Sequence, residues 1–571
     1  MTPPRAPGPL FSDTQATLLW AGLVGMLGAL ATVAFREGLA GLQWLLVGRS
    51  GSMVEMAKSL SWPMRVALPC LGGVVAGSLL LLAGRHAGDS KADYMESIAL
   101  GDGVISVRQT LLRSLSSLCS IGSGGSIGRE AAMIQLAATS ASVLGSARRM
   151  EPARLRLLVA CGAAAGITAA YNAPIASAFF ISEIVLGSIA MQSLGPIMIA
   201  AVTASITMRA LPGYKPTYEM PAFAQVANQE VALFIGLGIV AGLAAPQFLR
   251  LLELAKQLFQ RTRLPLPLRL GLGGLLVGVI SVQVPQVWGN GYSVVNSLLH
   301  TPWLWTSVVA MLCCKVLATA LTTGSGAVGG IFTPTLFVGA ALGHLFGQGM
   351  HALWPAFVSG PEAYTIVGMG AFLAAASSAP MMAIVMIFEM TASYQVMLPL
   401  MLACVIAYFV ANANSGKFMY DIMNKRRRSE EERWRVEQTR VSDLIRPAET
   451  VLPLSASLRD MTDMFARHPV KYIYIVDEAQ RYQGVVALQD LSAQMMDEVA
   501  IRQKHASDFV RPGFLDALTP ALPLAEALQH FLVHQGERLP VVQDQDNPVL
   551  LGAVHKTSLL DAYVRLQQLG H

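Results

Sequence analysis

The stretch from Ser120 to Gln135, SIGSGGSIGREAAMIQ, places a loop rich in glycine and serine between long apolar runs. Polar backbone at membrane depth is tolerated only where protein covers it or where it lines a water-filled path. The apolar run from Ala131 onward predicts a helix that starts at this loop, and free N–H groups make a helix N-terminus attractive to anions. We therefore expect the Glu130 carboxylate to compete with a mobile anion for one site. The alternative is that Glu130 only caps its helix and pairs with Arg129.

A second loop of this kind follows 202 residues later in the chain. The triplet Gly324-Ser325-Gly326 corresponds to Gly122-Ser123-Gly124, and Gly330 corresponds to Gly128. Broken helices at matching positions in two halves of a membrane protein point to a substrate site near the midplane of the bilayer. The sequence therefore predicts a duplicated membrane domain.

Two carboxylates repeat in a similar way inside apolar segments. Glu183 stands nine residues after Pro174, and Glu389 stands nine residues after Pro380. An ionisable group within a membrane helix is costly, so it is by default a functional candidate. Because the two positions match, the alternative is that each carboxylate forms a structural bond to the end of a neighbouring helix.

At these loops the chain resembles the CLC family of chloride channels and proton/chloride exchangers. Gly128-Arg129-Glu130 is similar to the family motif GREGP or GKEGP, Gly330-Ile331-Phe332-Thr333-Pro334 is similar to GxFxP, and SGKFMYD contains a tyrosine, Tyr420, similar to the family's anion-contacting tyrosine. The resemblance covers roughly residues 15 to 424. It implies that Glu130 is the external gate and that the anion is surrounded by Gly128, Arg129, Gly330, Ile331, Phe332 and Tyr420. It also implies a homodimer with one pore per protomer.

Three departures from the family pattern bear on mechanism. Ala131-Ala132 replaces the Gly-Pro that follows the gate, which leaves the gate itself in place. The family's first filter motif, GSGIPE, aligns with KADYME at residues 91–96, which is similar to the ClcB-type bacterial branch. Ala92 then stands where the family has its anion-coordinating serine, so we expect weaker discrimination among anions. Ile184 stands where exchangers have an internal proton-transfer glutamate, which leaves the adjacent Glu183 as the candidate proton relay.

The composition is that of an integral membrane protein rather than a large soluble enzyme. Of 571 residues, 53% are hydrophobic and 13% are charged, and the net charge of +5 gives no indication of nucleic-acid binding. Basic residues from Lys425 to Arg435 follow the last apolar run and predict the cytoplasmic side of the membrane. The resemblance to the ClcB-type branch implies that this membrane is a bacterial inner membrane. The six cysteines lie in apolar segments without metal-ligand spacing, so neither a disulfide framework nor a metal site is expected. We see no cleaved signal peptide at the N-terminus.

The apolar segments have irregular lengths. Residues 17–48 predict one long, tilted helix, whereas 156–187 and 364–390 are each longer than one crossing of about 20 residues. Such lengths favour tilted and broken helices around a buried site. The expected fold class is therefore an α-helical polytopic membrane protein, CLC-like, with two inverted repeats, followed by an α/β domain.

A soluble domain is expected from Arg440 onward, where charged residues alternate with short apolar strands. The segment Ser442–Pro447 recurs 65 residues later as Ser507–Pro512, and each copy precedes an amphipathic helix and two strands. This resembles a pair of CBS domains. In members that bind adenine nucleotides, a Thr and an Asp hold the ligand, and only Asp490 of that set is present here. A structural or regulatory module is therefore favoured over a nucleotide sensor.

These observations predict five segments and one leading function. The segments are a cytoplasmic stretch (1–15), the CLC-like domain (16–424), a basic linker (425–439) and two CBS domains (440–498 and 505–567). The leading function is transport of chloride or a similar small anion, gated by voltage or pH through Glu130, as a channel or a proton/chloride antiporter. No enzyme and no cofactor are expected, apart from an adenine nucleotide at the CBS pair. The alternatives are an intramembrane enzyme using Glu130 and Glu183, or a membrane sensor that signals through the CBS pair without anion flux.

Overall fold

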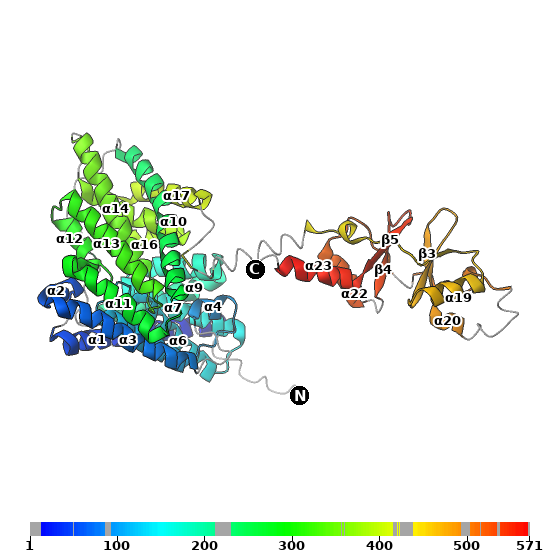
Figure 1. The fold of residues 1–571 in the computed structure, drawn as a ribbon, viewed down its shortest axis with the longest axis horizontal. Helices are drawn as coiled ribbons and strands as arrows, with labels where there is room; N and C mark the ends of the chain where they lie inside the picture. Colours follow the sequence, from blue (N-terminus) through cyan, green and yellow to red (C-terminus); the bar gives the residue numbers. More distant parts are fainter. Residues whose placement is uncertain are drawn as a thin grey trace, which may run out of the picture. The chain divides into compact units, whose positions relative to one another are not determined.

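The chain forms two compact units, Met1–Asn424 and Lys425–His571. Figure 1 shows that the first unit is built from helices and that the second also contains strands. The computed structural model describes residues 13–49, 51–85, 93–211, 218, 230–355, 357–358, 360–414, 419–420, 422, 438–492, 503–513, 516–533 and 537–568. Lys91, Ala92, the N-terminal segment to residue 12 and the basic residues from Lys425 to Arg435 lie outside these ranges.

The membrane unit consists of two halves with matching elements. The first half contains α1 (Asp13–Val47), α2 (Met53–Ser59), α3 (Trp62–Arg85), α4 (Tyr94–Ala99), α5 (Val107–Gly122), α6 (Glu130–Ala147), α7 (Pro152–Tyr171), α8 (Pro174–Phe180), a π-helical turn (Ile181–Leu186) and α9 (Met191–Ala210). The second half contains α10 (Val231–Arg261), α11 (Leu266–Gln283), α12 (Tyr292–His300), α13 (Trp305–Gly324), α14 (Phe332–Leu353), α15 (Pro361–Ser377), α16 (Pro380–Thr391) and α17 (Met397–Asn414). Eight helices among the described residues are long and apolar enough to cross a membrane.

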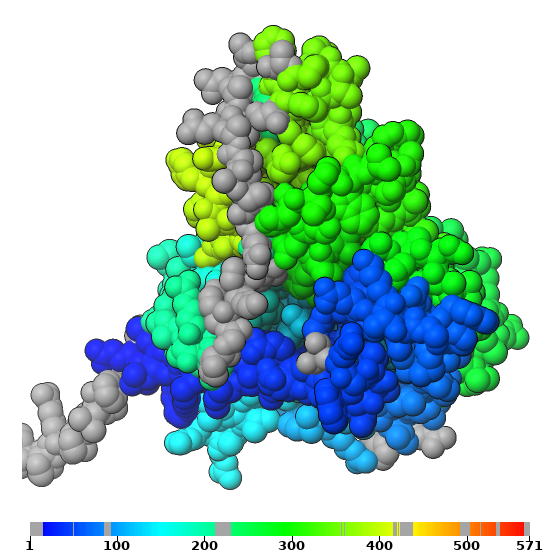
Figure 2. All heavy atoms as spheres, turned by 90° about the vertical axis from the view of Figure 1, so that its left-hand side faces the viewer, coloured from blue at the N-terminus to red at the C-terminus, as the bar shows by residue number. Residues whose placement is uncertain are grey.

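The boundaries of the helices confirm the predicted duplication. The helix before each Gly-rich loop ends at Gly122 or Gly324, and the helix after it begins at Glu130 or Phe332. Both pairs of boundaries are 202 residues apart, which is the offset between the two loops in the sequence. Helices α1, α3 and α6 lie on one side of the unit and α10, α14 and α17 on the other (Figure 1), and Figure 2 shows the same division between blue and green surfaces.

Close packing of α3 against α11 joins the two halves. A Cβ atom at Gly274 of α11 would overlap the Pro69 carbonyl of α3, and a Cβ atom at Gly73 would overlap the Leu270 carbonyl. Small residues allow two membrane helices to approach at backbone distance, where dispersion contacts replace the missing hydrophobic effect.

Each of the two long apolar segments is interrupted beside an Ala-Pro pair, Ala173-Pro174 in the first and Ala379-Pro380 in the second. The segment 156–187 divides into α7 and α8 around Asn172, and 364–390 divides into α15 and α16 around Ser378. Asn172 and Ser378 have φ angles of 55° and 53°, so each ends its helix in the left-handed region. The proline that follows cannot continue the preceding helix but is suited to the first turn of the next one.

Glu183 and Glu389 bind the helix ends that these breaks expose. The Glu389 carboxylate accepts hydrogen bonds from the amides of Ile175 (3.0 Å) and Ala176 (2.8 Å) at the start of α8. Glu183 Oε2 accepts one from the Met382 amide (2.9 Å) at the start of α16. Each half therefore supplies the acceptor for the broken helix of the other half. This is the structural bond that the matching positions predicted as the alternative for both carboxylates.

The described residues of the C-terminal unit form two small sheets. Strand β1 (Val451–Pro453) is parallel to β2 (Tyr472–Val476), which is antiparallel to β3 (Tyr482–Ala487), while β4 (Arg538–Val542) pairs antiparallel with β5 (Leu550–His555). The described helices of this unit are α19 (Leu458–Arg467), α20 (Leu488–Ser492), α22 (Leu524–Val533) and α23 (Lys556–Gln568).

The repeated Ser-Asp segments connect the two sheets of this unit. Arg446, at the end of the first copy, pairs through its backbone with Ala553 of β5, and Arg511, at the end of the second copy, pairs with Val485 of β3. Each segment is thus attached to the other repeat, and Val485 shares one apolar core with residues of β4 and β5. The 65-residue repetition in the sequence therefore corresponds to an intertwined pair.

Replacement of Glu389 by Ala is expected to destabilise the membrane unit. The change leaves the Ile175 and Ala176 amides at the start of α8 without their acceptor. An amide without a partner costs about 1–3 kcal/mol where water cannot replace the bond, and Glu389→Gln should lose less because one acceptor oxygen remains. The measurement is the thermal unfolding midpoint in detergent, with Glu37→Ala as the control because its side chain is 65% exposed. An unchanged midpoint for Glu389→Ala would contradict the capping role.

Candidate functional site

The two Gly-rich loops meet through their backbones. The Gly128 amide donates to the Gly330 carbonyl at 2.8 Å, and the Gly330 amide donates to the Gly128 carbonyl at 2.8 Å. Helix α6 begins two residues after Gly128, and α14 begins two residues after Gly330. This reciprocal pair of hydrogen bonds therefore holds the N-termini of two helices, one from each half, beside each other.

The loop conformation requires glycine at particular positions. The last glycine of each Gly-Ser-Gly triplet has a positive φ angle, +111° at Gly124 and +100° at Gly326. A Cβ atom at Gly128 would lie 2.8 Å from the Gly330 carbonyl oxygen and would also overlap the Glu130 carboxylate. A side chain at Gly128 is therefore incompatible with both the backbone bridge and the position of Glu130.

The Glu130 side chain is buried at the point where the loops meet. Glu130 is 2% exposed. Its Oε1 accepts a hydrogen bond from the Tyr292 hydroxyl (3.3 Å) and a longer one from Asn290 Nδ2 (3.5 Å). Oε2 has no hydrogen-bond partner among the described residues. Burial of a carboxylate with one oxygen unsatisfied is costly unless the surroundings favour negative charge, and the adjacent N-termini of α6 and α14 provide such surroundings.

The predicted alternative, an ion pair between Glu130 and Arg129, is not formed among the described residues. Arg129 is the N-cap residue of α6, and it lines a different cavity from Glu130. The two consecutive side chains therefore face separate spaces, because successive residues at a helix start point in different directions.

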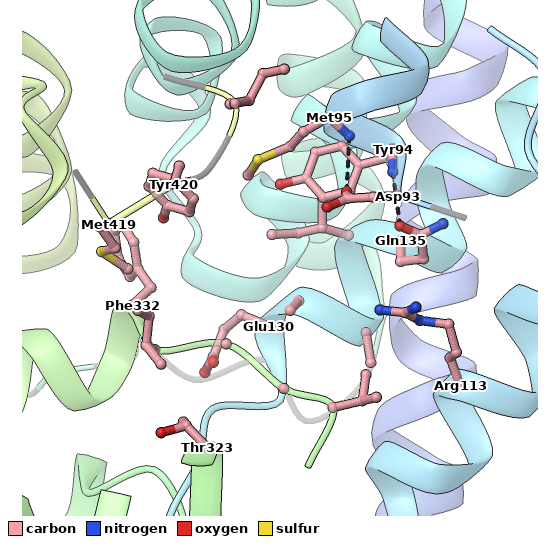
Figure 3. A pocket seen from close by; sticks show the side chains of 18 of the residues that line it. Asp93, Tyr94, Met95, Arg113, Glu130, Gln135, Thr323, Phe332, Met419 and Tyr420 are labelled. Carbon is pink, nitrogen blue, oxygen red and sulfur yellow. Dashed lines mark hydrogen bonds between the residues drawn. The ribbon is translucent and has the colours of Figure 1, made fainter. Parts of the chain in front are cut away.

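Around Glu130, the part of the chain that the structure describes lines two cavities. The inner cavity, of about 660 Å³, is lined by residues that include Asp93, Tyr94, Glu130, Ile331, Phe332 and Tyr420 (Figure 3). The outer cavity, of about 530 Å³, is lined by Arg36, Arg129, Asn290 and Tyr292 among others. Glu130 lines the first cavity and is hydrogen-bonded by two residues that line the second. Its side chain therefore lies between the two spaces.

The structure brings most of the predicted anion-binding residues together. Gly330, Ile331, Phe332 and Tyr420 line the inner cavity, whereas Gly128 lies in the backbone bridge and Arg129 lines the outer cavity. Tyr420 is held in place by ring packing, since its centroid lies 5.5 Å from that of Phe180, which in turn lies 6.3 Å from that of Phe332. Ala92, where the family has its serine, lies outside the described residues.

Sequence reasoning missed the hydrogen-bond network around Glu130, which joins Tyr292 of the outer cavity to Tyr171 of the inner cavity through Thr333. The Tyr292 hydroxyl contacts Thr333 Oγ1 at 3.3 Å, and the Tyr171 hydroxyl contacts the same oxygen at 3.4 Å. The signal was present as Asn290-Gly291-Tyr292, a polar break between two apolar segments that resembles no family motif quoted above.

A second omission is Lys315, a fully buried lysine in α13. Its Nζ donates to the carbonyls of Val287 (2.9 Å) and Gly289 (2.6 Å), immediately before Asn290. Trp288, between these carbonyls, is also fully buried and is the side chain that a Cβ atom at Gly124 would meet. Lys315 therefore fixes the segment that presents Asn290 and Tyr292 to Glu130. A lysine within an apolar helix was the signal that could have found it.

The candidate proton relay Glu183 and the candidate nucleotide-binding residue Asp490 both contact other parts of the protein. Glu183 binds the start of α16, and the neighbouring Ile184 is fully buried. In the C-terminal unit, the Asp490 carboxylate forms a short ion pair with Arg511, and its side chain is 21% exposed. The roles of Glu183 in proton transfer and of Asp490 in nucleotide binding stay predictions.

Comparison with known proteins identifies the class to which this fold and site belong. The voltage gated chloride channel family matches residues 72–412, and the CBS domain family matches residues 441–497 and 506–565. The chain belongs to the voltage gated chloride channel family and carries a C-terminal CBS pair. The predicted CLC family is thereby confirmed.

Two relatives belong to the ClcB-type branch that the sequence resembles. A putative chloride channel protein, ClcB-like, from Ralstonia nicotianae is 56% identical over 405 residues, which cover 70% of this chain and 94% of the relative. A voltage-gated ClC-type chloride channel, ClcB, from Citrobacter koseri is 41% identical over 400 residues, covering 68% of this chain and 94% of the relative.

Solved structures confirm the predicted fold class. A slow cyanobacterial Cl⁻/H⁺ antiporter is 26% identical, covers 73% of this chain and 98% of its own, and has a TM-score of 0.63. A eukaryotic CLC transporter with 16% identity covers 96% of this chain and 99% of its own with a TM-score of 0.62, which supports the fold alone. The protein is therefore a multi-pass integral membrane protein whose CBS pair is its C-terminal soluble part.

Proposed function

We propose that this protein transports chloride or a similar small anion across the membrane, with Glu130 as the gate. The observation that carries the proposal is the buried Glu130 carboxylate, which keeps one oxygen unpartnered beside two helix N-termini. A site that accommodates this fixed negative charge can accommodate a mobile anion of the same charge when the side chain leaves. The relatives from Ralstonia nicotianae and Citrobacter koseri, both described as chloride channels, support the same function.

The transport step follows from the two cavities. When Glu130 is ionised, its carboxylate occupies the position between them and excludes an anion. When it is protonated, it no longer gains from the helix N-termini, and an anion from the inner cavity takes its place. Helix ends and hydroxyl groups stabilise a dehydrated anion without a full opposite charge, so the anion can also leave.

Two other classes are less well supported. An intramembrane enzyme would use Glu130 and Glu183 together, but Glu183 is bound to the start of α16. A sensor without flux does not require a buried carboxylate between two cavities. The relatives, which are described as chloride channels and antiporters, also favour transport.

Chloride efflux from reconstituted liposomes at several pH values tests this function. Wild-type efflux is expected to rise as pH falls, because protonation releases Glu130 from its position. In Glu130→Gln, efflux is expected to be independent of pH and about tenfold faster at neutral pH, the factor that corresponds to about 1.4 kcal/mol of carboxylate binding. Glu37→Gln, at the rim of the outer cavity, is the control and should behave as wild type.

Two results would contradict this proposal in different ways. Absence of chloride efflux from correctly folded wild-type protein would exclude transport. A wild-type pH profile in Glu130→Gln would retain transport but exclude Glu130 as the gate.

We further propose proton/chloride exchange in which the proton reaches Glu130 without using Glu183. The gating carboxylate and the likeness to a Cl⁻/H⁺ antiporter support exchange, while the bond from the Met382 amide assigns Glu183 to the start of α16. A chloride gradient should then drive uphill proton uptake in wild type, and Glu183→Gln should keep the proton-to-chloride ratio while lowering the thermal midpoint. Chloride flux without proton uptake would establish a channel. Uptake lost in Glu183→Gln with intact chloride flux would make Glu183 the relay.

For the CBS pair we propose a structural or regulatory role without bound nucleotide. Asp490 is the one residue that the sequence retains from the nucleotide-binding set, and its carboxylate forms an ion pair with Arg511. Titration calorimetry of the full chain with ATP is expected to give no binding heat. Binding heat that disappears in Asp490→Asn would support a nucleotide sensor instead.

The assembly and orientation are also proposals. The resemblance to the CLC family supports a homodimer with one pore per protomer, and the basic residues from Lys425 to Arg435 support a CBS pair on the cytoplasmic side of a bacterial inner membrane. Cross-linking in native membranes, followed by protease access from each side, measures both properties. A monomer, or cleavage of the CBS pair from outside, would contradict them.

A further inference from the structure

Tyr94, the first residue of α4, lines the inner cavity together with Ile331, Phe332 and Tyr420. Tyr94 is 5% exposed. Figure 3 shows its ring directed from α4 into the cavity, on the side that faces Tyr420. Among the described residues, its hydroxyl has no hydrogen-bond partner, whereas its backbone does. The aromatic ring of Tyr94 is therefore buried, while its hydroxyl faces the inner cavity.

The backbone around Tyr94 is firmly held. The Tyr94 amide donates to Gln135 Oε1 at 3.1 Å, and Gln135 Nε2 donates to Thr110 Oγ1 at 3.3 Å. Gln135 belongs to α6, the helix that carries Glu130 at its start. The same helix therefore positions both the gate and the tyrosine.

The first two amides of α4 are already engaged. Gln135 accepts from the Tyr94 amide, and Asp93 Oδ1 accepts from the Met95 amide at 3.0 Å. An anion in the cavity therefore cannot use these two N–H groups, and the Asp93 carboxylate at this helix start would repel it. Of the described donors on Tyr94 and Met95, the Tyr94 hydroxyl is the one without a protein acceptor.

We propose that the Tyr94 hydroxyl donates a hydrogen bond to the transported anion in the inner cavity, facing Tyr420. This rests on the proposed function and identifies a residue that determines anion selectivity. A phenol hydroxyl donates more strongly to a small, charge-dense anion than to a large, diffuse one. Tyr94 thus supplies discrimination that the replacement of the family's serine by Ala92 would otherwise remove.

Tyr94→Phe is the direct test, because it removes the hydroxyl and keeps the ring. The measurement is the ratio of chloride to thiocyanate transport in reconstituted liposomes. The wild type should prefer chloride, and Tyr94→Phe should lower the ratio about tenfold, the size expected for loss of one hydrogen bond to a charged group. Tyr420→Phe should change the ratio in the same direction.

Tyr171→Phe is the matched control. Tyr171 lines the same cavity, but its hydroxyl already contacts Thr333 at 3.4 Å. Its replacement should leave the chloride-to-thiocyanate ratio within about twofold of wild type, because its hydroxyl is not free for the anion. An equal loss in both variants would indicate a general effect of cavity polarity and would overturn the specific role of Tyr94.

A second variant keeps the proposal testable if Tyr94→Phe folds poorly. Incorporation of 3,5-difluorotyrosine at position 94 makes the hydroxyl a stronger donor with little change in shape, and it should raise the ratio. An unchanged ratio in both Tyr94 variants, with normal chloride flux, would overturn this inference alone. Absence of anion flux in the wild type would overturn the proposed function itself.

Discussion

The reciprocal hydrogen bonds between Gly128 and Gly330 are the constraint on which the membrane domain depends. They join loops that are 202 residues apart in the sequence, and they place the starts of α6 and α14 beside each other. Neither loop could make this contact alone, since each presents one amide and one carbonyl to the other. A duplicated domain is therefore the natural way to build such a site, because each repeat contributes the same loop and half of the bridge.

This arrangement requires broken helices in a solvent that cannot satisfy exposed backbone groups. The amides freed at Ile175, Ala176 and Met382 are bonded by Glu389 and Glu183, each from the opposite half of the domain. The carboxylates accept from backbone amides, whereas Lys315 donates to two backbone carbonyls of the segment before Asn290. The ionisable side chains of Glu183, Glu389 and Lys315 thus complete backbone hydrogen bonding. Glu130 differs from these residues because one of its oxygens is left unsatisfied.

Much of this architecture could be predicted from the sequence. The two Gly-Ser-Gly loops, the position of Glu130 at the start of a helix and the cavity residues Ile331 and Phe332 are carried by short local motifs, which can be recognised without a structure. The boundaries of the long apolar segments were less clear, because apolar composition alone does not show where a helix is interrupted. The left-handed residues Asn172 and Ser378 set those breaks.

The parts that escaped prediction are contacts between distant residues. Tyr292 and Asn290 reach Glu130 from 160 or more residues away, and nothing in their local sequence specifies that partner. The pairing of Asp490 with Arg511 likewise depends on the exchange of segments between the two CBS repeats. The alternative pairing of Glu130 with Arg129 is not formed among the described residues, because these adjacent side chains at a helix start line different cavities.

The most direct test of this account is anomalous X-ray diffraction from crystals soaked in bromide, comparing wild type at neutral pH with Glu130→Gln. The central claim is that one position beside the Gly128–Gly330 bridge is shared by the Glu130 carboxylate and the transported anion. It predicts a bromide peak at the starts of α6 and α14 in Glu130→Gln that is absent from that position in the wild type. Bromide at this position in both proteins, or in neither, would contradict the claim.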